Sequence, residues 1–178
     1  MTKKIISIVI SAYNEEGNIN ELYKQLLQNT KEKDCRYKYE FVFVNDGSTD
    51  KTLGKIKALQ HHDSDVRIVN LKRNFGHEIA MTAGMDHALG DAVIFMDADL
   101  QHPPVLLKEM YKAVSEEGYD CCAGKRVDRT GEGKIRNFLS HAFYKVMQKM
   151  CKMDMSDGCG DFRMMSRQMV DAILELKE

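Results

Sequence analysis

Short apolar runs alternate with amphipathic stretches along most of the chain. The apolar runs cover residues 5–10, 39–44, 66–71 and 92–96, and the stretches with helical spacing cover residues 19–30, 52–60, 77–89 and 105–116. Apolar strands that are each followed by a helix are typical of a parallel sheet covered on both faces. The pattern predicts an α/β fold, a doubly wound and mainly parallel sheet with helices on both faces, whose ligands bind at the carboxyl ends of the strands.

The pattern changes after Gly118. We predict a short strand over residues 121–124, a basic loop over residues 125–133, a long amphipathic segment over residues 134–152, and a turn around residues 157–161 beyond the main sheet. A length of 178 residues suits one hydrophobic core. No repeat or linker interrupts the sequence, so residues 1–178 are interpreted as a single domain.

Composition narrows the class of protein. The 26 Lys and Arg residues nearly balance the 27 Asp and Glu residues, which argues against a nucleic-acid-binding protein. The five cysteines include no CxxC pair, which argues against zinc and disulfides and favours a cytoplasmic location. The six histidines show no metal-binding spacing and are expected to be solvated or capping residues. No apolar run approaches the roughly 18 residues of a membrane-spanning helix.

The candidate chemistry lies where the predicted strands end. The fourth apolar run ends at Asp97 and Asp99, two carboxylates one residue apart, and Gln101 continues the same parity. At the carboxyl end of a parallel strand, two such acids can hold a divalent cation against a diphosphate, and oxygen ligands favour Mg²⁺ or Mn²⁺. The alternative is that the acids cap the following helix. Capping needs one acid and leaves the second unexplained, so we favour the metal site.

The first and second strand exits are also acidic. Asp46 ends the second strand, where a carboxylate can accept hydrogen bonds from a nucleobase or ribose. Residues 48–50 are more typical of a turn and a helix cap. Glu15 and Glu16 fit either the first turn of a helix or a ligand site. Neither a GxGxxG nor a GxxxxGK[ST] motif is present, which argues against a dinucleotide oxidoreductase and a P-loop enzyme.

Two further features follow the predicted parallel strands. Asp161 belongs either to a plain surface turn or to a loop that closes over a site. The segment 134–152 has an apolar stripe and a basic face, and residues 125–152 contain eight Lys or Arg against two Asp or Glu. Such a segment either docks on the core or lies on an anionic membrane surface.

Four segments resemble, in order and spacing, the motifs of family 2 glycosyltransferases of the GT-A fold: residues 7–16, 44–50, 97–104 and 160–163. The resemblance covers essentially the whole chain. It is greatest to polyprenyl-phosphate glycosyltransferases, the group of bactoprenol glucosyltransferase and dolichol-phosphate mannosyltransferase. It implies a metal-dependent hexosyltransferase. Sequences of this family normally continue past Glu178, so the catalytic domain is expected to be short at its C-terminus.

The resemblance implies roles for residues on the donor side. The base and ribose of the nucleotide would be lined by Ala12, Tyr13, Glu15 and Asp46. Asp97 would face the nucleotide and the metal. Asp99, the second catalytic candidate beside Asp161, would hold Mg²⁺ or Mn²⁺ on the diphosphate, with Gln101 nearby.

The implied reaction moves a hexose, with inversion, from a nucleotide-sugar to a polyprenyl phosphate at the cytoplasmic face of the membrane. UDP-glucose is the expected donor. Arg126 and Arg129 would approach a donor or acceptor phosphate, and Asp161 would act as the base or organise the acceptor. Residues 134–152 would contact anionic lipid, and a homo-oligomer is compatible with this arrangement.

Two alternatives stay open. The acceptor could be a glycan hydroxyl in cell-wall or surface-polysaccharide synthesis, or the chain could be a nucleotide-binding module without turnover. The acceptor decides the role of Asp161. A hydroxyl needs a base, whereas a lipid phosphate with a second pKa of about 6 is largely dianionic at neutral pH and attacks without losing a proton.

Overall fold

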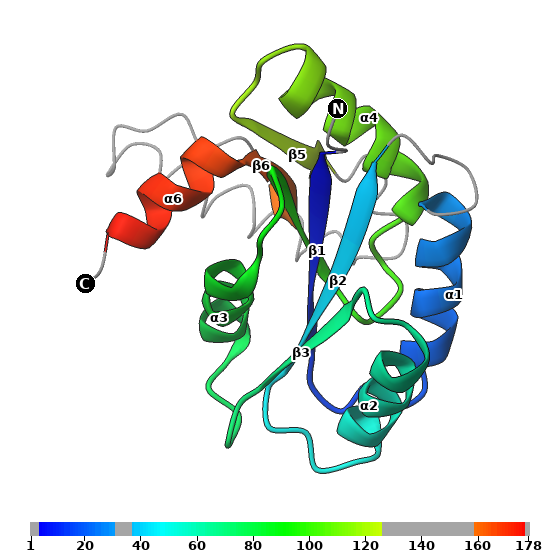
Figure 1. Ribbon diagram of the computed structural model, residues 1–178. Helices are drawn as coiled ribbons and strands as arrows, with labels where there is room; N and C mark the ends of the chain where they lie inside the picture. The colour runs from blue at the N-terminus through cyan, green and yellow to red at the C-terminus, as the bar shows by residue number, and fades with distance from the viewer. Residues whose placement is uncertain (1–3, 31–36, 126–158, 177–178) are drawn as a thin grey trace, which may run out of the picture.

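The computed structural model describes residues 4–30, 37–125 and 159–176. Within these ranges six strands form one mixed sheet in the order β3-β2-β1-β4-β6-β5 (Figure 1). The strands are β1 (Ile5–Ala12), β2 (Lys38–Asn45), β3 (Val66–Asn70), β4 (Ala92–Asp97), β5 (Cys121–Lys125) and β6 (Cys159–Ser166). Strands β1 to β4 run parallel, and β6 runs antiparallel to its neighbours β4 and β5.

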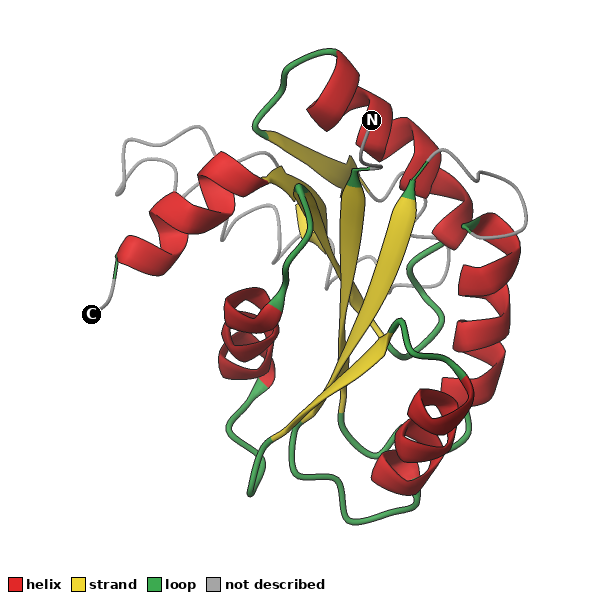
Figure 2. Ribbon diagram, viewed as in Figure 1, coloured by secondary structure: helices red, strands yellow, loops and turns green. Residues whose placement is uncertain are grey.

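Helices cover both faces of the sheet (Figure 2). One face carries α1 (Ile19–Asn29), α2 (Thr52–His62) and α4 (Leu107–Tyr111), and the other carries α3 (His77–His87) and α6 (Arg167–Glu175). Side chains alternate between these faces along each strand. In β1, Ile8 and Ile10 pack towards α1, while Val9 packs towards α3. Both faces are therefore buried, which confirms the predicted α/β architecture.

The predicted strands and helices are present up to β4, and their ends lie within two residues of the prediction. The β1 and β2 strands are almost entirely buried because Ile, Val and Phe occupy both alternating sets of positions. In α1 the buried residues Ile19, Leu22 and Leu26 recur at helical spacing. The spacing of apolar residues was therefore enough to predict the strands and helices from β1 to β4.

The helix predicted over residues 105–116 is less regular than expected. It consists of a 3₁₀ turn η1 (Pro104–Leu106), the short helix α4, and a π-helical turn η2 (Lys112–Glu116). Pro104 has no N–H to donate and fits the first turn, where no donor is needed. At the other end, the N–H of Glu117 donates to the carbonyl of Lys112 at 3.0 Å, which widens the last turn before β5.

The β6 strand overturns the predicted turn for residues 159–161, while residues 157 and 158 lie outside the described residues. From Cys159 the chain is a strand inserted between β4 and β5, so Asp161 lies in the sheet and not in a turn beyond it. Phe162 and Met164 pack into the core on one face, and Met165 packs on the other. Polar and apolar side chains alternate only from Asp161 to Met164, and Met165 then breaks the pattern, so the signal for a strand in the sequence is short.

A buried carboxylate links the strands near their amino ends. Glu40, within the apolar run of β2, is 9% exposed. Its Oε1 accepts the hydroxyl of Ser7 at 2.5 Å and the N–H of Leu89 at 2.6 Å, and its Oε2 lies 3.3 Å from Nη1 of Arg67. A buried charge is tolerated when it is paired and hydrogen-bonded. Glu40 is therefore explained by the architecture and lies away from the carboxyl ends of the strands.

Gly84 allows α3 to pack directly on the sheet. A Cβ atom at this position would lie 2.3 Å from Cγ1 of Val9 and 2.8 Å from Cγ2 of Val44, both of which are buried. We expect Gly84→Ala to lower the free energy of unfolding by about 1–3 kcal/mol, because stiff buried valines cannot yield without repacking.

A matched control for this prediction lies in α2. Gly54 is exposed, and a Cβ atom there meets nothing within 4 Å. Gly54→Ala is expected to raise the free energy of unfolding by up to about 1 kcal/mol through better helix propensity. Urea unfolding of both variants measures the difference. A Gly84→Ala variant at least as stable as wild type would show that α3 does not pack as described.

Candidate active site

The candidate site lies at the carboxyl ends of the parallel strands, at the lower edge of the sheet in Figure 1. The register brings these ends side by side. Ala12 of β1 pairs with Asn45 of β2, and Ser11 of β1 pairs with Asp97 of β4. The polar residues that follow β1, β2, β3 and β4 therefore meet along one edge of the sheet, as the α/β pattern predicts.

Asp97 is oriented by three contacts. Its Oδ1 accepts the hydroxyl of Ser11 at 2.8 Å and lies 3.3 Å from Nδ1 of His77. Its backbone N–H donates to Nδ1 of His102 at 2.9 Å, and the His102 ring stacks on Phe162 with 5.0 Å between centroids. The side chain of Asp97 remains 30% exposed, so the carboxylate is held in place and still accessible to a ligand.

Asp99 lies in the turn that follows β4. Its Oδ1 accepts the backbone N–H of Gln101 at 2.9 Å, and Leu100 between them has a φ of +66°. The 3₁₀ turn η1 begins after Pro103 without a side-chain cap. Neither Asp97 nor Asp99 caps a helix, so the capping alternative is wrong.

Asp97 and Asp99 fit a divalent cation that is shared with a diphosphate. Carboxylate oxygens are hard donors, and Mg²⁺ is commonly bound by one or two carboxylates together with substrate phosphates and water. In the part of the chain that the structure describes, no group of three or more His, Cys, Asp or Glu side chains could hold a metal by itself. The chemistry of the two carboxylates suits a cation that also binds a diphosphate.

Asp46 fixes the loop between β3 and α3. It is 4% exposed, and its carboxylate accepts the N–H of Phe75 at 2.8 Å and the N–H of Gly76 at 3.0 Å. Gly47, with a φ of +64°, lets the next turn touch the same loop, because a Cβ atom there would lie 2.2 Å from the carbonyl carbon of Arg73. The structure thus gives Asp46 an architectural task, and its contact with a nucleotide stays a prediction.

The loops after β1 and β2 are hydrogen-bonded to each other. Asn14, with a φ of +55°, accepts the N–H of Thr49 at 2.9 Å through its side chain and donates its own N–H to Oγ of Ser48 at 3.0 Å. The N-cap of α2 is Lys51, which makes no side-chain cap. The prediction that Ser48 or Thr49 caps α2 is therefore wrong, because Asn14 binds both residues instead.

Further hydrogen bonds at Glu15, Glu16 and Asp50 join the loops after β1 and β2. The N–H of Glu15 donates to the Thr52 hydroxyl at 2.8 Å, and the Glu15 carboxylate accepts the amide of Asn18 at 2.6 Å. Asp50 accepts the N–H of Thr52 at 2.9 Å and the N–H of Glu16 at 3.1 Å. The first two strand exits are therefore fixed relative to each other before any ligand binds.

Asp50 is expected to make stability depend on pH. Burial raises the pKa of this carboxyl, but hydrogen bonds from the hydroxyl and N–H of Thr52 and from the N–H of Glu16 outweigh it and hold the pKa below its ordinary value of 3.8. Because the pKa is lowered in the folded protein, this contribution is complete above pH 3.8 and is lost as the pH falls through the lowered value. Asp50→Asn is expected to lower the free energy of unfolding at pH 7, by an amount that shrinks in acid. Urea unfolding across this range measures the gap, and a gap independent of pH would contradict the assignment.

Two exposed aromatic side chains lie in the loops that follow the parallel strands. Of the four residues predicted to line the base and ribose, Ala12 is buried at the end of β1 and Tyr13 is 45% exposed. Phe75, on the loop after β3, is 41% exposed and lies 4.7 Å from the guanidinium carbon of Arg73. An exposed ring can stack on a base. Phe75 is a candidate that the sequence reasoning missed, although its place in a strand exit is a usable signal.

Asp161 enters the site from β6. Its Oδ1 pairs with Nη2 of Arg163 at 3.0 Å, and its Oδ2 lies 3.5 Å from Nε2 of His77. The other ring nitrogen of His77 faces Asp97, so the carboxylates from β6 and β4 lie on opposite sides of one imidazole. The expectation that the histidines are only solvated or capping residues is wrong for His77 and for His102, which accepts the Asp97 N–H.

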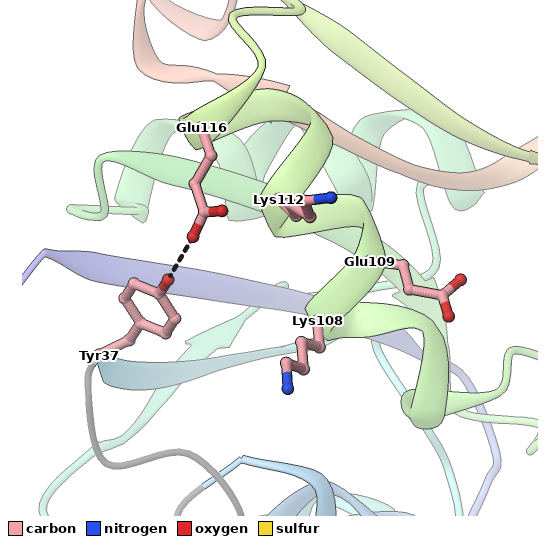
Figure 3. A pocket seen from close by; sticks show the side chains of 5 residues that line it. All are labelled: Tyr37, Lys108, Glu109, Lys112 and Glu116. Atoms are coloured by element: carbon pink, nitrogen blue, oxygen red, sulfur yellow. Dashed lines mark hydrogen bonds between the residues drawn. The ribbon is translucent and has the colours of Figure 1, made fainter.

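Two hollows on the described surface bear on the position of the site. A cleft of about 230 Å³ lies between α3 and α6, with His77, Asp161 and Arg163 at its polar side and Met81 and Met165 among its apolar residues. A larger hollow of about 390 Å³ is lined by Tyr37, Lys108, Glu109, Lys112 and Glu116 (Figure 3). Tyr37 precedes β2, so the larger hollow lies at the amino end of the strands, away from the site acids. The predicted site residue Asp161 therefore lines the smaller cleft and not the larger hollow.

Some predicted residues cannot be placed. Arg126, Arg129 and the segment 134–152 lie outside the described residues. Among the helices that are described, none has the length and apolar character to span a bilayer.

A comparison with protein families decides the class of the chain. The family model of glycosyl transferase family 2 matches residues 7–174. The chain belongs to glycosyl transferase family 2. This membership confirms the resemblance seen in the sequence motifs, and the matched range includes Asp46, Asp97, Asp99 and Asp161.

Two curated relatives are 46% and 39% identical in sequence to this chain. The chain is 46% identical over 178 residues to CsbB of Bacillus subtilis (strain 168), covering 100% of this chain and 53% of that protein. It is 39% identical over 173 residues to the bactoprenol glucosyl transferase of Shigella phage SfV, covering 97% of this chain and 55% of that protein. The chain thus spans about half the length of the curated relatives that it matches.

Solved structures of glycosyltransferases have the same GT-A fold. The mannosyltransferase PcManGT from Pyrobaculum calidifontis, in complex with GDP-Man and Mn²⁺, has a TM-score of 0.65 at 19% identity and covers 97% of this chain and 47% of that one. The glucosyl-3-phosphoglycerate synthase from Mycobacterium tuberculosis, in complex with Mn²⁺, UDP-glucose and phosphoglyceric acid, has a TM-score of 0.63 at 21% identity and covers 93% and 57%. These similarities identify the GT-A fold of this family 2 chain.

Proposed function

We propose that this family 2 protein transfers a hexose from a nucleotide-sugar to a polyprenyl phosphate, with inversion at the anomeric carbon. The observation that carries the proposal is the pair Asp97 and Asp99 at the end of the buried strand β4, where Asp97 pairs with Ser11 at the end of β1. The 39% identity to a bactoprenol glucosyl transferase over 97% of the chain supports the polyprenyl acceptor. We propose further that the catalytic unit is a single domain.

The donor is proposed to lie across the carboxyl ends of β1, β2 and β4. The residues for its base and ribose are Ala12, Tyr13, Glu15 and Asp46. Asp97, Asp99 and Gln101 would hold Mg²⁺ or Mn²⁺. When bound, this cation supplies Lewis-acid stabilisation of the charge on the departing nucleoside diphosphate. Mn²⁺ in two solved GT-A structures supports the cation, and UDP-glucose in one of them supports the donor that we favour.

The acceptor is proposed to approach from the side of Asp161. A dianionic lipid phosphate attacks the anomeric carbon without a base. Because a carboxylate repels a phosphate dianion, Asp161 is proposed to orient the acceptor through its partner Arg163, whose guanidinium can bind the phosphate. Arg126 and Arg129 are proposed to bind a donor or acceptor phosphate. The basic segment 134–152 is proposed to rest on anionic lipid at the cytoplasmic face of the membrane, where the polyprenyl chain is anchored.

A glycan hydroxyl is the second candidate acceptor. The observation that favours it is the Asp161 carboxylate, whose side chain is 48% exposed beside the cleft and is available as a base. This alternative shares the donor site and the cation with the first, and it differs only in what attacks.

A thermal-shift panel followed by a transfer assay tests the proposal. We expect UDP-glucose with Mn²⁺ to raise the melting temperature, because a ligand at about 100 times its Kd stabilises the native state by about 2.7 kcal/mol. Labelled glucose is then expected to appear on polyprenyl phosphate in detergent micelles. Transfer to a glycan alone would establish the second candidate, and binding without transfer to either acceptor would leave a nucleotide-binding module.

A further inference from the structure

His77 lies between the carboxylates of two different strands. Its Nδ1 lies 3.3 Å from Oδ1 of Asp97 and 3.1 Å from Oγ of Ser11, and its Nε2 lies 3.5 Å from Oδ2 of Asp161. The Ser11 hydroxyl donates to Asp97. Three groups from β1, β4 and β6 therefore converge on one side chain of α3.

The backbone that carries His77 is itself fixed. His77 is the first residue of α3 and follows Gly76, whose φ is +96°. The N–H groups of Phe75 and Gly76 both donate to Asp46, so the buried end of β2 anchors the loop from which His77 projects. A side chain on such a loop has little freedom to move away from the two carboxylates.

Helix formation does not explain this residue. The first turn of a helix disfavours positive charge, and histidine is not among the residues that start helices well. The α3 helix also has no side-chain cap at Gly76. The contacts made by the ring are the remaining explanation for a histidine at this position.

The Nε2 atom of His77 is free to form a further hydrogen bond. It is buried, and among the described residues it has no hydrogen-bond partner. Its distance of 3.5 Å from Asp161 is longer than a hydrogen bond. Gaps of this kind are common in active sites without substrate and close when the substrate binds. On the other side of Asp161, Arg163 already holds the second carboxylate oxygen at 3.0 Å.

We propose that His77 is a positioning residue that orients Asp161 towards the donor side of the site. The inference rests on the proposed function, because it assigns Asp161 to the acceptor. Arg163 holds one oxygen of the Asp161 carboxylate, and Nε2 of His77 faces the other, so that closure of the 3.5 Å gap would fix the direction of the carboxylate relative to Asp97. The acceptor that Asp161 orients is thereby aligned with the anomeric carbon, whose leaving diphosphate lies against Asp97 and Asp99.

Three substitutions distinguish the contributions of the two ring nitrogens of His77, Nδ1 and Nε2. His77→Gln keeps a polar group at the distance of Nε2, His77→Asn keeps one only at the distance of Nδ1, and His77→Leu keeps neither. We expect His77→Leu and His77→Asn to lower kcat by about 10- to 100-fold, because small errors of alignment have effects of this size, with the KM for the nucleotide-sugar nearly unchanged. His77→Gln is expected to restore most of the lost turnover. A melting temperature near that of wild type shows that each variant is folded.

A double-mutant cycle with Asp161 decides the mechanism. If His77 acts through Asp161, then His77→Leu costs nothing further in an Asp161→Ala background, whereas independent roles give additive losses. Additive losses, or a His77→Leu enzyme with the kcat of wild type, would overturn the proposal while the transferase function stands. A wild-type protein that transfers no sugar would overturn the proposed function itself.

Discussion

Replacing Asp99 by asparagine is expected to lower kcat/KM for sugar transfer by about 10²- to 10³-fold, the usual loss when one group that stabilises charge in the transition state is removed. Asparagine keeps the size of aspartate and an oxygen that can accept the N–H of Gln101, so the turn after β4 is retained. What is lost is the negative charge that would hold the cation. The melting temperature is therefore expected to stay close to that of wild type.

The measurement combines a transfer assay with a binding assay. Calorimetry with UDP in the absence of metal is expected to give the same Kd for wild type and Asp99→Asn, and the gain in affinity on adding Mn²⁺ is expected only in wild type. Asp86→Asn is a matched control, because Asp86 is an exposed acid in the second half of α3, outside the set of residues assigned to the site. An Asp99→Asn variant with full turnover, or with the Mn²⁺ gain intact, would contradict the assignment.

The second large effect is expected at Asp161, and it depends on the acceptor. Asp161→Ala is expected to lower kcat by about 10²-fold, because the acceptor is no longer held in line. Asparagine retains an oxygen for Arg163, which lies 3.0 Å from Oδ1 in the native protein. With a phosphate acceptor, which needs no base, Asp161→Asn is therefore expected to keep most of its turnover. With a hydroxyl acceptor it is expected to lose about 10²- to 10⁴-fold, like the alanine variant, because the base is gone.

The ratio of the two Asp161 variants thus identifies the attacking group. It is measured as kcat on polyprenyl phosphate and on a glycan acceptor, with the KM for the nucleotide-sugar as an internal check on the donor side. Equal losses for asparagine and alanine on the lipid phosphate would show that Asp161 acts as a base even there, and would rule out a role in orientation alone.

Several features of the site follow from local patterns in the sequence. The acids Asp97 and Asp99 stand out because they end a run of buried β-formers, and a parallel strand places its carboxyl end at the ligand edge of the sheet. Asp46 is conspicuous for the same reason at the end of β2. The structure adds that Asp46 also binds the N–H groups of the next strand exit, a task that no spacing in the sequence reveals.

Other features are invisible to local patterns. The start of β6 was expected as a turn because polar and apolar side chains alternate only from Asp161 to Met164, too short a signal for a strand, and because its partners β4 and β5 are distant in the chain. His77 was expected to be solvated because no metal-like spacing surrounds it in the chain. Its partners Ser11, Asp97 and Asp161 come from three strands, and 66 residues separate it from Ser11 alone.

The sequence by itself determined the α/β class, the helices and strands up to β4, and the acids at their exits, because these depend on periodicity over a few residues and on the rule that parallel strands present their carboxyl ends together. Only the tertiary structure decided that β6 enters the sheet beside β4 and that His77 lies between Asp97 and Asp161. The physical reason is that strand pairing and side-chain convergence are contacts between distant segments. Their free energy depends on the whole arrangement of the chain, and no short stretch of sequence contains it.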